Sequence, residues 1–120
     1  METNEESLPP IDLVLRSSSG AVGVEVRGDV DAATVDVLCA ALEAADEAPK
    51  LVVDLSATQF IDLAGVRALA TCARRRRARG RDLLVLAPPP SAESILQMAP
   101  FCWDLQWQAR ERRPAARSGS

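Results

Sequence analysis

The chain has 120 residues, the usual size of one domain, with 48% hydrophobic residues and a net charge of −3. Its lack of histidine and tyrosine removes the commonest general base and the commonest metal ligand, and three cysteines without CxxC spacing indicate buried free thiols rather than a disulfide framework or zinc site. The N-terminus is acidic, where a signal peptide would be basic, and the longest apolar runs are about half the roughly 20 residues needed to cross a bilayer. We therefore expect a cytoplasmic protein without a signal peptide or membrane insertion. No residue pattern indicates an enzyme or a cofactor.

An opening β-hairpin follows a polar tail over residues 1–10. Serines and a glycine in segment 17–20 supply the turn between two alternating runs. Alternate side chains of a strand lie on the same face, so one apolar set is expected to face the core. Its members are Ile11, Leu13, Leu15, Val22, Val24 and Val26.

Apolar spacing then changes to the helical period. We expect a helix of about four turns that begins at Asp31, whose carboxylate can cap the first free amides. The continuous apolar run 51–55 predicts a central parallel strand covered on both faces.

The second half of the domain repeats this alternation of helix and strand. A second helix is expected between Asp62 as its cap and Gly80 as its left-handed stop. A buried strand over 83–86, a third helix capped by Ser91, and a short strand over 105–107 follow. The predicted class is α/β: a single domain over residues 11–108, with a mixed, mostly parallel sheet of four or five strands flanked by helices, and a C-terminal tail over 109–120.

Asp62 stands where a buried strand gives way to a helix, the position at which functional groups gather in α/β sheets. Its carboxylate is expected to accept hydrogen bonds from amides near Ala64 and Gly65. Gly65 would keep the surface small enough for a partner's backbone to approach. The alternative is that Asp62 is only a helix cap.

Residues 51–66, Leu-Val-Val-Asp-Leu-Ser-Ala-Thr-Gln-Phe-Ile-Asp-Leu-Ala-Gly-Val, closely resemble the central motif of the STAS domain, found in bacterial anti-sigma-factor antagonists and sulphate transporter tails. Gly28-Asp29-Val30-Asp31 resembles the second signature of this family. The resemblance extends from about residue 11 to 107, and it implies a four- or five-stranded sheet flanked by helices.

The resemblance implies a regulatory binding protein that docks on a kinase-fold anti-sigma factor. Antagonists of the family carry Asp-Ser-Ser-Gly, with the second serine phosphorylated, where this chain has Asp62-Leu63-Ala64-Gly65. Ala64 has no hydroxyl, so the usual switch cannot operate there. The residues expected at the partner surface are Asp29, Asp31, Ser56, Thr58, Asp62, Leu63, Ala64 and Gly65.

Several alternatives remain open at this point. Ser56 and Thr58 are either modified or, as loop hydroxyls usually are, hydrogen-bonded locally. Asp29 and Asp31 can hold a turn and a cap as well as border the partner surface. A second function that the resemblance allows is the small cytoplasmic STAS subunit of a lipid-exporting ABC transporter, in contact with the transporter's ATPase.

Three clusters have simple structural interpretations. The arginines at 74–77, 79 and 81 point in different directions on a helix, which favours a solvated helix end over nucleic-acid binding. The carboxylates of Glu43, Asp46 and Glu47 lack the order of metal ligands and are expected to be solvated. Near the C-terminus, Trp103, Leu105 and Trp107 alternate on one strand face, which favours the core over an exposed binding patch.

Overall fold

The computed structural model describes residues 11–18, 20–98 and 105–109. The two predicted tails, except for residue 109, lie outside the described residues, as do Phe101, Cys102 and Trp103. The elements in chain order are β1 (Asp12–Ser18), β2 (Ala21–Arg27), α1 (Val35–Ala44), β3 (Lys50–Asp54), α2 (Leu63–Ala78), β4 (Asp82–Leu86), α3 (Pro90–Met98) and β5 (Gln106–Gln108).

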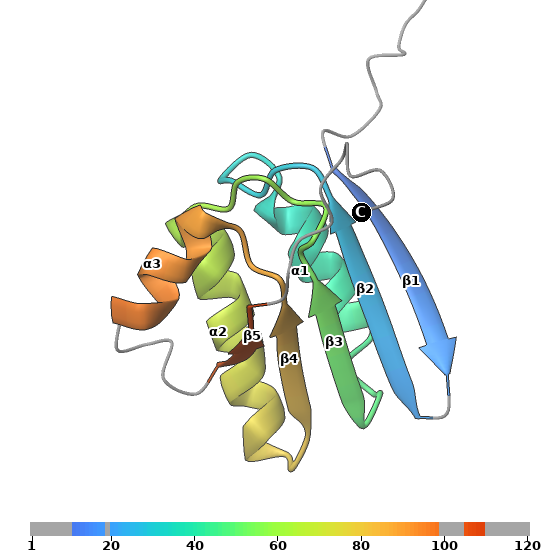
Figure 1. Ribbon diagram of the computed structural model, residues 1–120. Helices are drawn as coiled ribbons and strands as arrows, with labels where there is room; N and C mark the ends of the chain where they lie inside the picture. The colour runs from blue at the N-terminus through green and yellow to red at the C-terminus, as the bar shows by residue number, and fades with distance from the viewer. Residues whose placement is uncertain (1–10, 19, 99–104, 110–120) are drawn as a thin grey trace, which may run out of the picture.

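The five strands form one sheet in the order β1-β2-β3-β4-β5 (Figure 1). The hairpin pair β1–β2 is antiparallel and every other pair is parallel. The predicted class, a mixed and mostly parallel α/β sheet with β3 at its centre, is therefore confirmed. None of the helices in the described ranges is long and apolar enough to span a bilayer.

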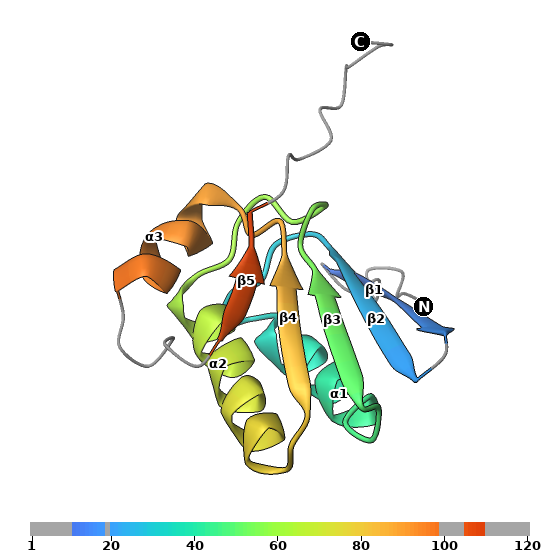
Figure 2. The same cartoon turned by 60° about the horizontal axis from the view of Figure 1, so that its bottom comes forward.

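Helices α1 and α2 lie on the same face of the sheet (Figures 1 and 2). Each parallel crossover moves one strand further in the same direction, and right-handed crossovers that all progress one way put their helices on one face. The expectation that β3 is covered on both faces is therefore wrong for the described residues. Leu51 and Val53 point toward the helices and are buried, whereas Val52 on the other face is half-buried.

The core lies between the sheet and α1 and α2, and most of the predicted apolar residues belong to it. In the hairpin, Ile11, Val24 and Val26 are buried, and Leu13 packs against the core. Leu15 is an exception with 49% of its surface exposed, because β1 is the edge strand and α1 packs against β2. At the other edge, Leu105 is buried and Trp107 packs against the core, as predicted.

Helix boundaries differ from the sequence predictions at two N-termini. The first helix begins at Val35 rather than at Asp31, because residues 32–34 form a separate turn, and it is about three turns long. The third begins at Pro90, a residue well suited to the first turn of a helix. Ser91 does not cap this helix; its hydroxyl bonds to the backbone of Ile61 instead.

Helix α2 ends at the predicted glycine. Gly80 has φ +74°, and its N–H donates to Arg77 O at 3.0 Å while Arg81 N–H donates to Arg76 O at 2.9 Å. These two bonds form a Schellman motif, which satisfies carbonyls that the end of the helix leaves free.

Arg76 contradicts the prediction of a wholly solvated arginine run, because its side chain is fully buried. The guanidinium donates to three backbone carbonyls at 2.6–3.0 Å, those of Asp46, Ala48 and Asp82. One arginine thus joins the end of α2 to the α1–β3 loop and to the start of β4. A buried charge needs such a complete set of acceptors, since burying it without them is costly.

Asp46 is also not the freely solvated carboxylate that the sequence suggests. Its carboxylate pairs with Arg79 and lies 3.5 Å from the Arg76 guanidinium. The hydrogen bond from Arg79, with the positive charges of Arg79 and Arg76, lowers the pKa of Asp46 below its ordinary value.

We expect Arg76→Met to destabilise the fold by about 3 kcal/mol or more, because it removes charge-assisted hydrogen bonds from three carbonyls. Urea unfolding monitored by circular dichroism measures this loss. The matched control is Arg74→Met on the exposed side of the same helix, which should change stability by no more than about 0.5 kcal/mol. Equal unfolding midpoints for the two variants would contradict the structural role of Arg76.

Candidate functional site

The two signature segments of the sequence lie side by side beyond the carboxyl ends of β2 and β3. An isolated parallel bridge joins Val30 to Ile61. Val30 N–H donates to Phe60 O at 2.9 Å, and Asp62 N–H donates to Val30 O at 3.0 Å. This bridge, which we call the loop bridge, fixes the approach of the chain to α2.

Asp62 is the N-cap of α2, as predicted. It has an extended backbone conformation, and its Oδ1 accepts a hydrogen bond from Gly65 N–H at 3.1 Å. The cap satisfies one of the amides that a helix start leaves free and orders the first turn of α2. The side chains of Leu63 and Ala64 in this turn are exposed and half-buried, respectively.

Asp31 holds the neighbouring loop in a turn ahead of α1. Its Oδ1 accepts from Ala33 N–H at 2.9 Å and Thr34 N–H at 3.1 Å. Thr34 Oγ1 donates to Asp29 O at 3.0 Å, which ties the same loop together again. The predicted turn is confirmed, although Asp31 caps this turn rather than the helix, whose N-cap is Thr34.

A polar hollow of about 480 Å³ is bordered by both loops. It is lined by Gly28, Asp29, Asp31, Thr34, Ala57 and Gln59. The structure thus brings Asp29 and Asp31 to the same end of the sheet as the start of α2. Within the described ranges, no group of three or more histidine, cysteine or acidic side chains could hold a metal ion.

Gly65 is not part of an open surface, contrary to the sequence expectation. It is buried, and a Cβ atom at this position would lie 2.5 Å from Ile61 Cγ1 and 2.8 Å from Val30 Cγ1. The residue is small because the loop bridge passes over the first turn of α2, and not because a partner's backbone must approach it.

Of the two hydroxyl candidates, Thr58 is fully buried, and its hydroxyl donates to Val26 O at 2.8 Å. Its placement on the partner surface was therefore wrong: the side chain anchors the loop to the end of β2. Ser56 is half-buried, and its backbone N–H donates to the Asp54 carboxylate at 2.9 Å.

Phe60 is a surface residue that the sequence interpretation missed. It is 44% exposed, and Leu63, two residues beyond Ile61, is 45% exposed. Ile61 between them is fully buried, and both its backbone groups bond to the Ser91 hydroxyl at 3.2 Å. We call Phe60, Asp62, Leu63 and Ala64 the Asp62 patch. The signal available in the sequence was a large aromatic residue in a loop, beside the candidate aspartate.

Ala64 also lines a groove of about 360 Å³ between α1 and α2, together with the thiols Cys39 and Cys72. Cys72 is buried as predicted, whereas Cys39 is only partly so. Burial raises the pKa of both thiols, so both are protonated at neutral pH and poor nucleophiles.

We expect Gly65→Ala to cost about 1–3 kcal/mol of stability, because the new methyl group would overlap the loop bridge. Thermal or urea unfolding measures the loss. Gly23→Ala in β2 is the matched control, since its added methyl group would meet nothing within 4 Å. An equally stable Gly65→Ala protein would show that this packing is not tight.

Comparison with known proteins agrees with this geometry. Residues 13–101 match the family model described as Mlab, STAS domain. The structure resembles an anti-sigma factor antagonist from Mycobacterium paratuberculosis, with 26% identity, a TM-score of 0.71, and coverage of 81% of this chain and 84% of that one.

Two further solved structures share the fold at lower identity. The phosphorylated form of SpoIIAA, a Bacillus cell fate determinant, is 17% identical with a TM-score of 0.65, covering 81% of this chain and 91% of that one. A putative anti-sigma factor antagonist from Thermotoga maritima is 10% identical with a TM-score of 0.70, covering 79% and 84%. Since the family model covers most of the sequence, the chain belongs to the STAS domain family.

Proposed function

We propose that this protein is a non-enzymatic, cytoplasmic bacterial regulator that binds a kinase-fold anti-sigma factor through the Asp62 patch. The observation that carries the proposal is the pair of exposed apolar side chains, Phe60 and Leu63, beside the capped start of α2. Membership of the STAS family supports it, as does similarity to an anti-sigma factor antagonist.

The Asp62 patch has the properties of a protein-binding surface. Its backbone is held by the loop bridge and the helix cap, so little conformational entropy would be lost on binding. Large apolar side chains on a fixed backbone are typical anchors of protein interfaces. Catalysis is a poorer interpretation, because the chain has no histidine and the Asp62 carboxylate is engaged by the Gly65 amide.

Because residue 64 is an alanine, the charge of this surface cannot be changed by phosphorylation at that position. A phosphate here would add about −1.5 to −2 charges and three acceptor oxygens, enough to reshape an interface. The methyl group of Ala64 cannot accept one, and of the two nearby hydroxyl candidates Thr58 is buried and Ser56 is half-buried. We therefore infer that binding is not switched off by phosphorylation at Ala64 and persists in the presence of ATP, so that it is set by the abundance of the protein or by modification elsewhere.

A second candidate is the small STAS subunit of a lipid-exporting ABC transporter, in contact with its ATPase. The same absence of a hydroxyl at Ala64 favours it, because a partner that is not a protein kinase needs no acceptor. Copurification with an ATPase in the membrane fraction, and no capture of an anti-sigma factor, would replace the first proposal by this one.

Asp62→Arg should abolish capture of the anti-sigma factor, because it places a long cation in the Asp62 patch. The cost to folding should be only the about 0.5–2 kcal/mol of a lost cap. Pull-down of the anti-sigma factor encoded nearest the gene, with and without ATP, measures binding, and circular dichroism measures folding.

The matched control is Asp82→Arg, which makes the same charge change at an exposed position at the opposite end of the sheet. It should bind like the parent protein. Equal capture by Asp62→Arg would remove this patch from the interface, and loss of capture on adding ATP would contradict constant binding.

Phe60→Ser and Leu63→Ser should each weaken partner binding by about tenfold or more, the usual effect of removing an apolar anchor. Isothermal titration calorimetry gives the affinities. Met98→Ser on α3, where the side chain is 78% exposed, is the control for removing surface hydrophobicity. If all three variants bind equally well, the exposed apolar pair is not the contact surface.

A further inference from the structure

The outer edge of β1 is a second surface able to bind protein. Strand β1 is the first strand of the sheet, and among the described residues it pairs with β2 alone (Figure 1). An edge strand carries backbone N–H and C=O groups that can pair with another strand. Natural proteins usually protect an exposed edge strand of this length from pairing with other chains. The side chains of β1 therefore indicate whether pairing is prevented or favoured.

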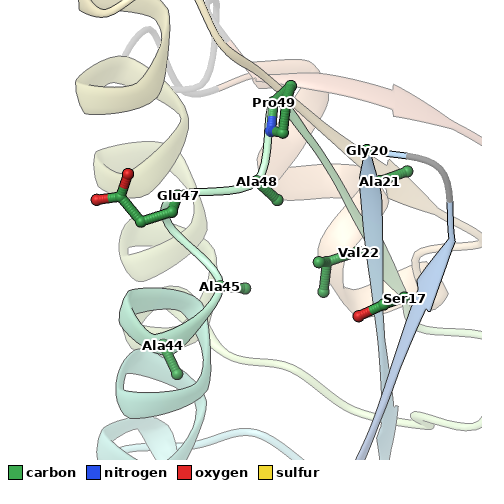
Figure 3. Close-up of a pocket in the computed structure, with 9 residues that line it drawn as sticks. All are labelled: Ser17, Gly20, Ala21, Val22, Ala44, Ala45, Glu47, Ala48 and Pro49. Carbon is green, nitrogen blue, oxygen red and sulfur yellow. The ribbon is translucent and has the colours of Figure 1, made fainter.

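The helix-facing side of this edge is apolar and incompletely covered. Leu15 is 49% exposed, and a hollow of about 570 Å³ separates the tip of the hairpin from the end of α1 (Figure 3). Ser17 and Val22 line it on the hairpin side, and Ala44 on the helix side. Val37, seven residues before Ala44 and so on the same side of α1, is 38% exposed.

The sequence of the strand is complementary to itself. Residues 12–16 read Asp-Leu-Val-Leu-Arg. A leucine stands on each side of Val14, and the segment has a negative charge at one end and a positive charge at the other. In an antiparallel pair of two such strands with Val14 facing Val14, each Asp12 lies opposite Arg16 of the other copy. Each Leu15 then lies opposite Leu13 of the other copy.

We propose that two copies of this chain associate through their β1 edges in this register, forming one continuous ten-stranded sheet. The arrangement has a two-fold axis through the Val14 pair, as expected for a homodimer. It brings four leucines together on the helix-facing side, where Leu15 is otherwise exposed. This proposal goes beyond the binding function proposed above and does not depend on it.

Charges on the other face of the sheet select this register. Within one copy, Glu25 lies 3.5 Å from Arg16 and 3.3 Å from Arg27, and Arg27 is directly opposite Asp12. Joining Arg16 to Asp12 of the second copy makes a row of alternating charge, Glu25–Arg16 of one copy followed by Asp12–Arg27 of the other. A shift by two residues would leave these charges unmatched, and a shift by one would turn the two helical layers to opposite faces.

The dimer leaves the Asp62 patch free in both copies. Strand β1 forms one edge of the sheet, whereas α2 packs against β4 (Figure 1). A dimer would therefore present two Asp62 patches. A single strand pair makes a small interface, so dissociation is expected at low protein concentration.

Sedimentation equilibrium over a wide range of protein concentration tests the proposal with charge-reversed variants. Asp12→Arg puts two arginines opposite each other, and Arg16→Asp does the same with two aspartates. Each variant should raise the dimer dissociation constant by roughly tenfold or more, since like charges opposite each other destabilise a strand pair. Both residues are exposed, so each variant should still fold, with some loss of stability because Asp12→Arg faces Arg27 across the hairpin and Arg16→Asp loses its ion pair with Glu25.

Two restorations serve as controls. The double variant Asp12→Arg/Arg16→Asp regains both opposite-charge pairs between the copies and should dimerise more tightly than either single variant. An equimolar mixture of the two single variants should form a heterodimer, because every facing pair in it is again oppositely charged. A parent protein that stays monomeric at all concentrations, dimerisation insensitive to either reversal, or failure of both restorations would overturn the proposal.

Discussion

The loop bridge between Val30 and Ile61 is the constraint on which the candidate site depends. It extends the parallel pairing of β2 and β3 past the ends of both strands, so two loops far apart in sequence behave as one unit. Its position requires that Gly65 carry no Cβ, since Ile61 and Val30 occupy that space. Phe60 is then exposed, because the residue next to an inward-facing side chain in extended backbone points outward, and Leu63 is exposed separately, on the first turn of α2.

The bridge is stabilised from several sides by hydrogen bonds of small polar side chains. Thr58 joins the second loop to β2, Ser91 joins it to α3, and Thr34 closes the first loop on itself. Each bond satisfies a backbone group that an irregular loop would otherwise leave without a partner. A loop held in this way can present apolar side chains to solvent without collapsing onto them. This fixed conformation supports the binding role proposed above for the Asp62 patch.

Periodicity in the sequence was sufficient to predict the element order, the cap at Asp62 and the stop at Gly80, because each depends on nearby residues. Contacts between distant segments were not predictable in the same way. Arg76 looked like one of several solvated arginines, since its carbonyl acceptors lie 28–30 residues before it and at position 82. Gly65 was assigned to an open surface because local sequence does not show which way a helix turn faces. Coverage of the sheet on one face depends on the strand order, which no single segment specifies.

The two proposed surfaces differ in how their binding strength can be controlled. The start of a helix stabilises negative charge, which makes it a suitable place for a phosphate switch. In the function proposed above, Ala64 would remove that control and leave apolar contacts, whose strength depends little on salt or on modification. Pairing of the β1 edges, in contrast, depends on protein concentration and on two exposed charge pairs. Where two Asp62 patches are held together, binding to a partner with two sites would strengthen through avidity. A higher protein concentration would then increase partner binding in two ways: it supplies more copies of the protein, and it raises the fraction of copies that are dimeric.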